Sequence, residues 1–265
     1  MILDGKSLSD KIADELKCRA ANLDIKLAVI LVGDNPASIK YVNAKRKRAI
    51  EIGIKCEISS LPTDVSETEL LKLINEFNND DSISGLMIQL PLPEHINQAN
   101  VTRAINPDKD VDGLNPASGF MPATVLGIER LLENYKIDLA GRVAVVVGRS
   151  EIVGKPAARM LLNHDATVII CHSRTRDLAA FTRQADILVS AVGIPNLITP
   201  EHIKNDVVII DAGTIGDVQK SCYEKAAAYT PVPGGVGPMT IISLMENTIQ
   251  SAEFFCHSRA GGNRA

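Results

Sequence analysis

Continuous runs of apolar, largely β-branched residues alternate with helical patterns along this chain, and this alternation limits the possible folds more than any other feature. The clearest runs lie at residues 143–147, 167–171, 187–192 and 207–211. Strands that are apolar throughout are typical of parallel sheets covered by helices on both faces. The sequence therefore predicts an α/β fold.

The N-terminal half shows the same alternation and supplies signals for where helices begin and end. Pro36 opens a basic helical stretch, and Gly53 closes it in the manner of a C-terminal cap. Ser66 and Glu69 form the sequence pattern of a capping box. The other expected elements are a helix through Leu8, Ile12 and Leu16, strands over 27–32, 54–59 and 83–90, and a final helix over 241–255.

Composition excludes several classes of function. The chain has 265 residues and a formal net charge of −4, which argues against general nucleic-acid binding and against recruitment to an anionic membrane. Its five cysteines are scattered, its histidines show no metal-binding spacing, and no apolar stretch reaches the roughly 18 residues that span a bilayer. We therefore expect a soluble, cytoplasmic protein that binds no metal, no nucleic acid and no membrane.

The segment 231–240 contains three prolines and three glycines. Proline fixes φ and lacks a backbone donor, while glycine reaches φ values that other residues avoid. We expect a preorganised loop that is not helical and whose backbone can approach a flat ligand. A rigid turn between domains is the alternative.

The run 142–147 leads into Gly148-Arg149-Ser150-Glu151-Ile152-Val153-Gly154. A buried strand that passes through a glycine turn into a helix is typical of a dinucleotide site, where free N–H groups and the helix dipole attract a pyrophosphate. The spacing G-x-S-x-x-x-G differs from the usual G-x-G-x-x-G. An ordinary strand-to-helix turn therefore remains an alternative.

The next strand bears on the choice of cofactor. It ends at Cys171-His172-Ser173-Arg174, without the acid that usually binds the ribose 2′-OH of NAD. Arg149, Ser150, Ser173 and Arg174 could together surround a 2′-phosphate, because the guanidinium group donates to phosphate in bidentate fashion. These residues favour NADP, and a solvated basic loop is the alternative.

Three further segments carry polar residues suited to chemistry. Tyr41 and Lys45 lie four residues apart and hence on one helix face, although Lys45 also fits a solvated basic face. Gln89 stands in the apolar setting Ile88-Gln89-Leu90-Pro91, at the end of a strand where α/β proteins bind ligands. The segment 109–113 adds Asp110 and Asp112, which an acidic surface turn would equally explain.

The order of these motifs resembles that of the bifunctional methylenetetrahydrofolate dehydrogenase/methenyltetrahydrofolate cyclohydrolase family, from about Leu3 to Phe255. The motifs are Tyr41-x-x-x-Lys45, Gln89-Leu90-Pro91-Leu92-Pro93, Asp110-Val111-Asp112-Gly113, Gly148-Arg149-Ser150 and the 231–240 segment. The resemblance implies NADP-dependent oxidation of 5,10-methylenetetrahydrofolate and hydrolysis of the methenyl product to 10-formyltetrahydrofolate. It also implies a place in one-carbon metabolism and purine biosynthesis, and a homodimer.

The resemblance implies two lobes, a folate-binding catalytic lobe over 1–114 and a Rossmann-like NADP domain over 115–238. The helix 239–256 is expected to pack back on the first lobe, and the tail 257–265 to be disordered. Lys45 matches the catalytic lysine, Gln89 its hydrogen-bonding partner, Tyr41 the residue that stacks on folate, and Asp112 the carboxylate that binds the pterin edge. The remaining implied residues are Gly148, Arg149, Ser150, Gly154, Ser173, Arg174 and Thr214 for the cofactor, and Ile88, Leu90, Pro233, Gly234, Gly235, Val236 and Gly237 for the substrate.

The chain also departs from the family pattern. Pro122-Ala123-Thr124-Val125 replaces a usual Pro-Cys-Thr-Pro, and Thr214-Ile215 leads directly to Gly216-Asp217 without the usual longer excursion. Three alternatives therefore stay open: a cyclohydrolase with an impaired dehydrogenase, a catalytically silent folate- or nucleotide-binding protein, and an NADP-dependent dehydrogenase of another small metabolite.

Overall fold

The computed structural model describes residues 1–261, which form two compact units. Unit 1 comprises Met1–Asp10 and Thr124–Thr240, and unit 2 comprises Lys11–Ala123 and the residues from Ile241 onward. Each unit is built around its own parallel sheet. The expected α/β class is confirmed.

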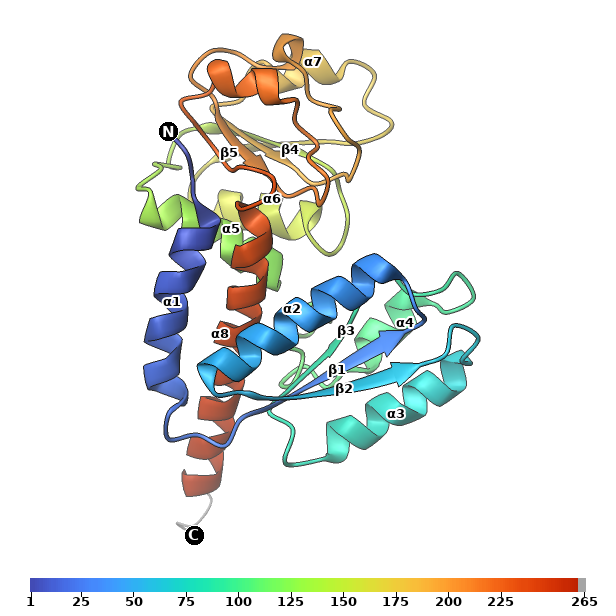
Figure 1. The fold of residues 1–265 in the computed structure, drawn as a ribbon. Helices are drawn as coiled ribbons and strands as arrows, with labels where there is room; N and C mark the ends of the chain where they lie inside the picture. The colour runs from blue at the N-terminus through green and yellow to red at the C-terminus, as the bar shows by residue number, and fades with distance from the viewer. Residues whose placement is uncertain (262–265) are drawn as a thin grey trace. The chain divides into compact units, whose positions relative to one another are not determined.

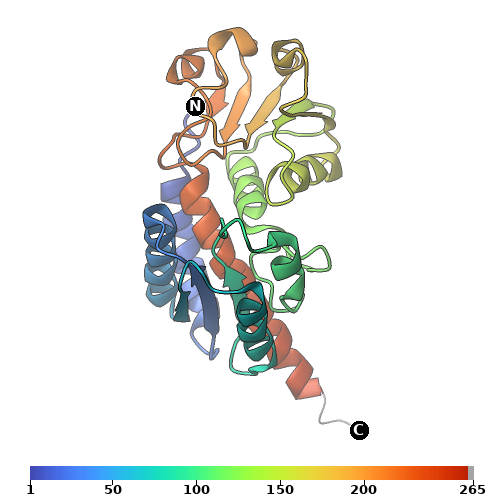
Figure 2. The ribbon, with the colours of Figure 1, turned by 90° about the vertical axis from the view of Figure 1, so that its right-hand side faces the viewer.

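The sheet of unit 2 has the strand order β2-β1-β3. β1 (Lys26–Val32) lies between β2 (Lys55–Leu61) and β3 (Gly85–Ile88), and its side chains are buried from Leu27 onward. Helix α2 (Pro36–Ile52) lies on one side of this sheet, and α3 (Glu67–Asn79) and α4 (Gln98–Ala104) lie on the other (Figures 1 and 2). Both faces of the sheet are therefore covered, as continuous apolar strands require.

The helix boundaries of α2 and α3 follow from their capping residues. The Asn35 side chain accepts hydrogen bonds from the first turn of α2, Pro36 occupies the first helical position, and Gly53 ends the helix with φ 97°. Only glycine adopts this left-handed conformation without strain. Ser66 and Glu69 form the predicted capping box of α3. These local predictions are confirmed.

The segment that follows α4 runs beside β3. The Leu86 amide donates to the Lys109 carbonyl at 2.7 Å, and Leu86 forms a parallel bridge with Asp110. The Lys109 ammonium donates to the carbonyls of Phe77, Asn78 and Asp80 around the end of α3. These bonds fix the backbone of residues 109–111 against the sheet.

Two long helices, α1 (Gly5–Ala20) and α8 (Val236–Gly261), begin in unit 1 and continue into unit 2. Within unit 2, Arg19 forms a bidentate ion pair with Glu253, and the Ser251 hydroxyl donates to the Ser84 carbonyl at 2.6 Å. The later part of α8 therefore packs beside β3 and the end of α1 (Figure 1).

α8 corrects two expectations. The segment 231–240 is helical from Val236, because Pro238 falls in the first turn, where amide groups have no partner within the helix. The tail is helical as far as Gly261, because His257-Ser258-Arg259-Ala260 contains no helix breaker. Residues 262–265, where disorder was also expected, lie outside the described residues.

The sheet of unit 1 has the order β5-β4-β6-β7-β8, all parallel. Ile2 forms a parallel bridge with Tyr229 in β8, so the start of the chain extends this sheet. The strand order reverses between β4 and β6, which is the switch point where α/β sheets bind ligands. The strands are β4 (Val143–Val147), β5 (Thr167–Cys171), β6 (Ile187–Ser190), β7 (Val208–Asp211) and β8 (Ala228–Tyr229); the connecting helices are α5 (Ala123–Asn134), α6 (Gly154–Asn163), α7 (Leu178–Thr182), η1 (Pro200–His202) and η2 (Lys220–Glu224).

Candidate active site and cofactor site

The structure places Lys45 on the buried face of α2, not on a solvated basic face. Ser38, Val42, Lys45 and Ala49 follow one another along this face at helical spacing, and all are buried. Only 6% of Lys45 remains exposed. Tyr41, one turn earlier, is partly exposed. The long methylene stem of Lys45 thus packs in the interior and carries its amine toward β3.

The Lys45 amine meets two side chains from β3 and its end. Its Nζ donates to Gln89 Oε1 at 3.1 Å and lies 3.6 Å from Met87 Sδ. The Gln89 amide is itself fixed, because its Nε2 donates to the Leu90 carbonyl at 2.7 Å. Residues two apart in a strand point to the same face. Met87 and Gln89 therefore face α2, while Leu86 and Ile88 point into the core shared with α3 and α4.

Asp112 completes the charged part of this cluster. Burial lowers the pKa of Lys45, and the charge of Asp112 partly offsets that effect. Burial likewise raises the pKa of Asp112, against the opposing effect of Lys45. Loss of water thus shifts the pKa of each group in the direction that favours its neutral form. The charge of each group opposes the pKa shift of the other. The structure thus places Gln89 within hydrogen-bond distance of the Lys45 amine and Asp112 close enough to affect its pKa.

Asp110 is a second buried carboxyl group in the same loop. Its Oδ2 accepts the Asn115 amide at 2.7 Å, while its Oδ1 is buried without a hydrogen-bond partner. Burial raises the pKa of Asp110 to about 7, and the like charge of Asp112 adds to the effect. The sequence drew attention to Asp110 but assigned it no place in the site. Its alignment with Leu86 depends on a tertiary bridge that the sequence does not reveal.

The two substrate residues expected beside Gln89 have different surroundings. Ile88 is only 2% exposed and its side chain belongs to the core. Leu90 is partly exposed. An Ile88 contact with a ligand would therefore have to come from its backbone, whereas the Leu90 side chain is accessible.

In unit 1, the glycines of the β4–α6 turn are required by packing. Gly148 has φ 120°, and a Cβ there would lie 2.6 Å from the Ala191 carbonyl oxygen. A Cβ at Gly154 would lie 2.5 Å from the Gly148 carbonyl oxygen. Both positions are thus filled by protein backbone. The glycines allow β4, β6 and the start of α6 to approach one another.

The same turn leaves polar groups at the start of α6. The N-cap residue Val153 provides no side-chain hydrogen bond, and Ser150 Oγ accepts from the Val153 and Gly154 amides, both at 3.2 Å. Arg149 and Ser150 are exposed. A helix N-terminus with an adjacent arginine attracts anions.

The loop after β5 is held in a defined turn. The His172 amide donates to Thr175 Oγ1 at 2.9 Å, and the Arg174 amide donates to His172 Nδ1 at 3.2 Å. Ser173 and Arg174 are exposed on this turn. Because β4 and β5 are parallel neighbours, their two loops lie at the same edge of the sheet. These residues fit a phosphorylated dinucleotide in charge and position on the sheet.

The shortened loop after β7 is closed by two buried carboxylates. Asp211 accepts the Gly213 and Val218 amides, and Asp217 Oδ2 accepts the Ser190 hydroxyl at 2.9 Å and the Val192 amide at 2.8 Å. Thr214 is exposed at the tip of this turn. The loop is therefore compact and tied to β6 despite its missing excursion.

The expected folate loop, residues 233–237, also lies in unit 1. The Lys6 amide donates to the Gly234 carbonyl at 2.9 Å, and the Gly235 amide donates to the Pro231 carbonyl at 2.7 Å. Pro233 and Gly237 are exposed, whereas Gly235 and Val236 are buried. The exposed backbone of this loop thus comes from its two ends.

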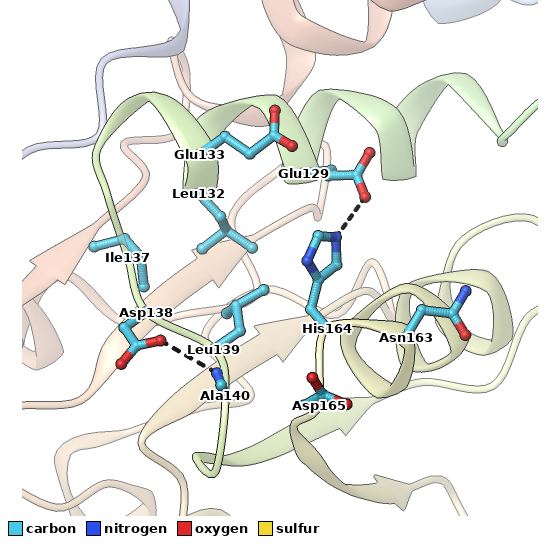
Figure 3. Close-up of a pocket in the computed structure, with 10 residues that line it drawn as sticks. All are labelled: Glu129, Leu132, Glu133, Ile137, Asp138, Leu139, Ala140, Asn163, His164 and Asp165. Atoms are coloured by element: carbon cyan, nitrogen blue, oxygen red, sulfur yellow. Dashed lines mark hydrogen bonds and ion pairs between the residues drawn. The ribbon is translucent and has the colours of Figure 1, made fainter.

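A cavity of about 370 Å³ in unit 1 lies between α5, the segment that follows α5, and the end of α6 (Figure 3). His164, at the end of α6, contacts Glu129 of α5 at 2.8 Å across it. No predicted site residue is among those that line it. The lining residues are Glu129, Leu132, Glu133, Ile137, Asp138, Leu139, Ala140, Asn163, His164 and Asp165.

No cluster of three or more His, Cys, Asp or Glu side chains within residues 1–261 is arranged to hold a metal ion. Over the same part of the chain, no helix has the length and apolar character needed to cross a membrane.

Solved structures with this fold include known folate enzymes. The bifunctional FolD methylenetetrahydrofolate dehydrogenase/cyclohydrolase of Campylobacter jejuni is 46% identical with a TM-score of 0.93, covering 96% of this chain and 99% of that one. A Trypanosoma brucei enzyme complexed with NADP cofactor and inhibitor is 33% identical with a TM-score of 0.93, covering 100% of this chain and 99% of that one. A shikimate dehydrogenase of Aquifex aeolicus, 14% identical with a TM-score of 0.58, shares the fold alone.

Sequence comparisons agree with the structural ones. The Bifunctional protein FolD of Aquifex aeolicus is 47% identical over 275 residues, covering 95% of this chain and 94% of the relative. Residues 3–112 match the catalytic domain of the tetrahydrofolate dehydrogenase/cyclohydrolase family, and residues 122–256 match its NAD(P)-binding domain. Because these matches cover nearly the whole chain, the protein belongs to the tetrahydrofolate dehydrogenase/cyclohydrolase family.

Proposed function

We propose that this chain oxidises 5,10-methylenetetrahydrofolate with NADP⁺ and hydrolyses the 5,10-methenyl product to 10-formyltetrahydrofolate. Family membership supports both activities. The single observation that carries the hydrolytic step is the buried Lys45 amine, bonded to Gln89 and under the influence of Asp112. A buried amine with a lowered pKa is suited to accept a proton near neutral pH.

Lys45 acts as the general base of hydrolysis. Its neutral amine takes a proton from the water that attacks the cationic methenyl carbon. The ammonium that forms is stabilised by Gln89 Oε1 and by the charge of Asp112. Gln89 therefore orients the base, because its own amide is fixed by the Leu90 carbonyl.

Four further folate contacts come from the same unit as this amine. Tyr41, partly exposed one turn earlier on α2, offers an aromatic face for the pterin. Asp112 binds the polar edge of the pterin, Leu90 supplies a side-chain contact, and Ile88 a backbone contact. The segment 233–237 lines the folate site through its exposed backbone. Hydride transfer needs mainly this positioning.

NADP is held at the carboxyl ends of the unit 1 strands. Arg149, Ser150, Ser173 and Arg174 bind its 2′-phosphate, the start of α6 faces the pyrophosphate, and Thr214 borders the cofactor. Gly148 and Gly154 act indirectly, because they allow the close packing of this turn. When bound, NADP⁺ accepts a hydride from the methylene carbon of the substrate.

We extend this proposal to the setting of the enzyme. It works as a cytoplasmic homodimer in one-carbon metabolism, supplies purine biosynthesis and binds no nucleic acid. Membership of a family that includes proteins named bifunctional supports two activities over a single-activity cyclohydrolase or a silent binding protein. Sedimentation equilibrium tests the dimer.

The first test is a spectrophotometric assay with 5,10-methylenetetrahydrofolate and NADP⁺, run beside the variant Lys45→Met. The wild-type protein is expected to form NADPH and then to remove the methenyl absorbance faster than the enzyme-free rate. The variant is expected to lose the hydrolysis while it still binds folate. Hydrolysis retained by Lys45→Met would contradict the assignment of the base.

A further inference from the structure

The Lys45 amine has a second neighbour on β3 that the sequence does not single out. Met87 is fully buried, and its Sδ lies 3.6 Å from Lys45 Nζ. It occupies the same face of β3 as Gln89, whose Oε1 lies 3.1 Å from the same nitrogen. One amine therefore has two acceptors of different strength, an amide oxygen and a thioether sulfur.

The two contacts can be compared with the number of N–H groups that the amine has in each protonation state. A neutral amine has two N–H groups and one lone pair, whereas an ammonium has three N–H groups and no lone pair. A buried N–H group without an acceptor costs free energy. Two protein acceptors match the two N–H groups of the neutral form and leave the lone pair in the remaining tetrahedral direction.

We propose that Met87 is a positioning residue for Lys45: together with Gln89 it accepts the N–H groups of the neutral amine, so that the lone pair is left for the proton of the reacting water. This inference rests on the proposed role of Lys45 as the base. In the step, an O–H bond of water breaks and its proton joins Nζ. The water oxygen bonds to the methenyl carbon, and the C=N π pair moves to the nitrogen, which removes the positive charge of the substrate.

The charged surroundings are consistent with this arrangement. Burial lowers the pKa of Lys45, which favours the neutral amine. The loop after α4 supplies Asp112, which opposes that shift, and Asp110, whose pKa Asp112 helps to raise. From α2, Tyr41 lies one turn before Lys45. β3 supplies Met87, and the residue directly after β3 is Gln89. Neither side chain titrates, so their effect on the amine comes through hydrogen bonding.

The test is the pH dependence of hydrolysis of 5,10-methenyltetrahydrofolate in Met87→Leu. Leucine keeps the apolar volume and removes the acceptor. We expect kcat to fall about three- to tenfold, which corresponds to one weak hydrogen bond, with KM nearly unchanged. The acid limb of the profile should move to lower pH, because the ammonium loses an acceptor. Met245→Leu, at an equally buried methionine of α8, is the matched control and should follow the wild type.

A second variant, Met87→Gln, is expected to move the acid limb in the opposite direction to Met87→Leu. It places an amide oxygen, a stronger acceptor than sulfur, near the amine, so the acid limb should move to higher pH. If Met87 acts in packing alone, the acid limb of the pH profile should move by the same amount in both Met87 variants or should not move at all. Either result overturns the proposal. Far-ultraviolet circular dichroism and thermal unfolding establish that each variant is folded.

The variant Lys45→Met distinguishes a failure of the base assignment from a failure of the inference about Met87. If that variant still hydrolyses the substrate, the base assignment fails and the proposal for Met87 fails with it. If Lys45→Met is inactive while Met87→Leu and Met87→Gln both keep the wild-type profile, Lys45 remains the base and only the inference about Met87 is overturned.

Discussion

Lys45 is a charged residue type in a buried position. Its α2 face is otherwise formed by Ser38, Val42, Ala49 and Ile52, so its charge is not required for packing. A buried lysine is costly unless its amine is neutral or has partners. Gln89 provides a direct partner and Asp112 a nearby opposite charge. The protonation of the Lys45 amine is therefore controlled by its burial and its neighbours.

Asp110 is expected to make the stability of the protein depend on pH. Its pKa is raised to about 7 in the folded chain, above its ordinary value of 3.8. Between these values the folded state binds more protons than the unfolded state, so the free energy of unfolding should fall as pH rises through this window. In Asp110→Asn this part of the dependence should disappear. Urea unfolding at pH 5 and pH 8 measures it.

The control for Asp110 is Asp108→Asn, which removes the same charge from an exposed residue two positions earlier. It should retain the wild-type dependence on pH. An Asp110→Asn protein with an unchanged difference between pH 5 and pH 8 would show that Asp110 does not hold the proton in the folded state.

At the scale of single elements, β3 is the shortest strand of its sheet, and β3 and the residue directly after it supply the two acceptors of the Lys45 amine. Its alternation sends Leu86 and Ile88 into the core and Met87 and Gln89 toward α2. A shift of one residue in its pairing with β1 would exchange these two sets. The hydrophobic core on the α3 side therefore fixes the position of Met87 and Gln89 on the other side.

The capping box of α3 is an element-scale feature with a measurable contribution. Ser66 Oγ accepts the Glu69 amide, and the Glu69 carboxylate accepts the Ser66 amide. Ser66→Ala should lower the free energy of unfolding by about 1 kcal/mol. Ser66→Thr keeps the hydroxyl and should recover most of it. Chemical denaturation compares the three proteins, and an unchanged midpoint in Ser66→Ala would argue against a contribution from this cap.

At the scale of the whole molecule, the two units contain different candidate sites. Unit 2 contains the Lys45 cluster, and unit 1 contains the strand ends suited to a dinucleotide. Helices α1 and α8 each contribute residues to both units. Folding of either unit thus involves residues from distant parts of the sequence.

Cofactor binding should be visible in the stability of the whole chain. A ligand that binds only the folded state raises its stability in proportion to the logarithm of concentration over Kd. We expect NADP to raise the unfolding temperature by several degrees and NAD to raise it less. Arg149→Ala should reduce the NADP shift more than the NAD shift, because it removes a donor to the 2′-phosphate. Differential scanning calorimetry measures both, and equal losses would mean that Arg149 does not distinguish the two cofactors.

Much of the fold was predictable because its signals are local. These signals act through neighbours in sequence. They are the apolar strands, the residues Asn35-Pro36 and Gly53 at the ends of α2, and the capping box of α3. The exceptions are also local in origin. Residues 236–240 form helix despite Gly237 and Pro238, because the first helical turn tolerates a residue without a donor.

The sequence by itself determined the α/β class, the helix boundaries set by capping residues, and the order of motifs that identifies the family. Only the tertiary structure decided that Lys45 is buried, that Met87 lies beside its amine, and that Asp110 aligns with Leu86. The physical reason is that burial and pKa depend on groups far apart in the chain. Lys45 belongs to the basic run Lys45-Arg46-Lys47-Arg48, and its pKa is lowered only because the fold removes water from its amine.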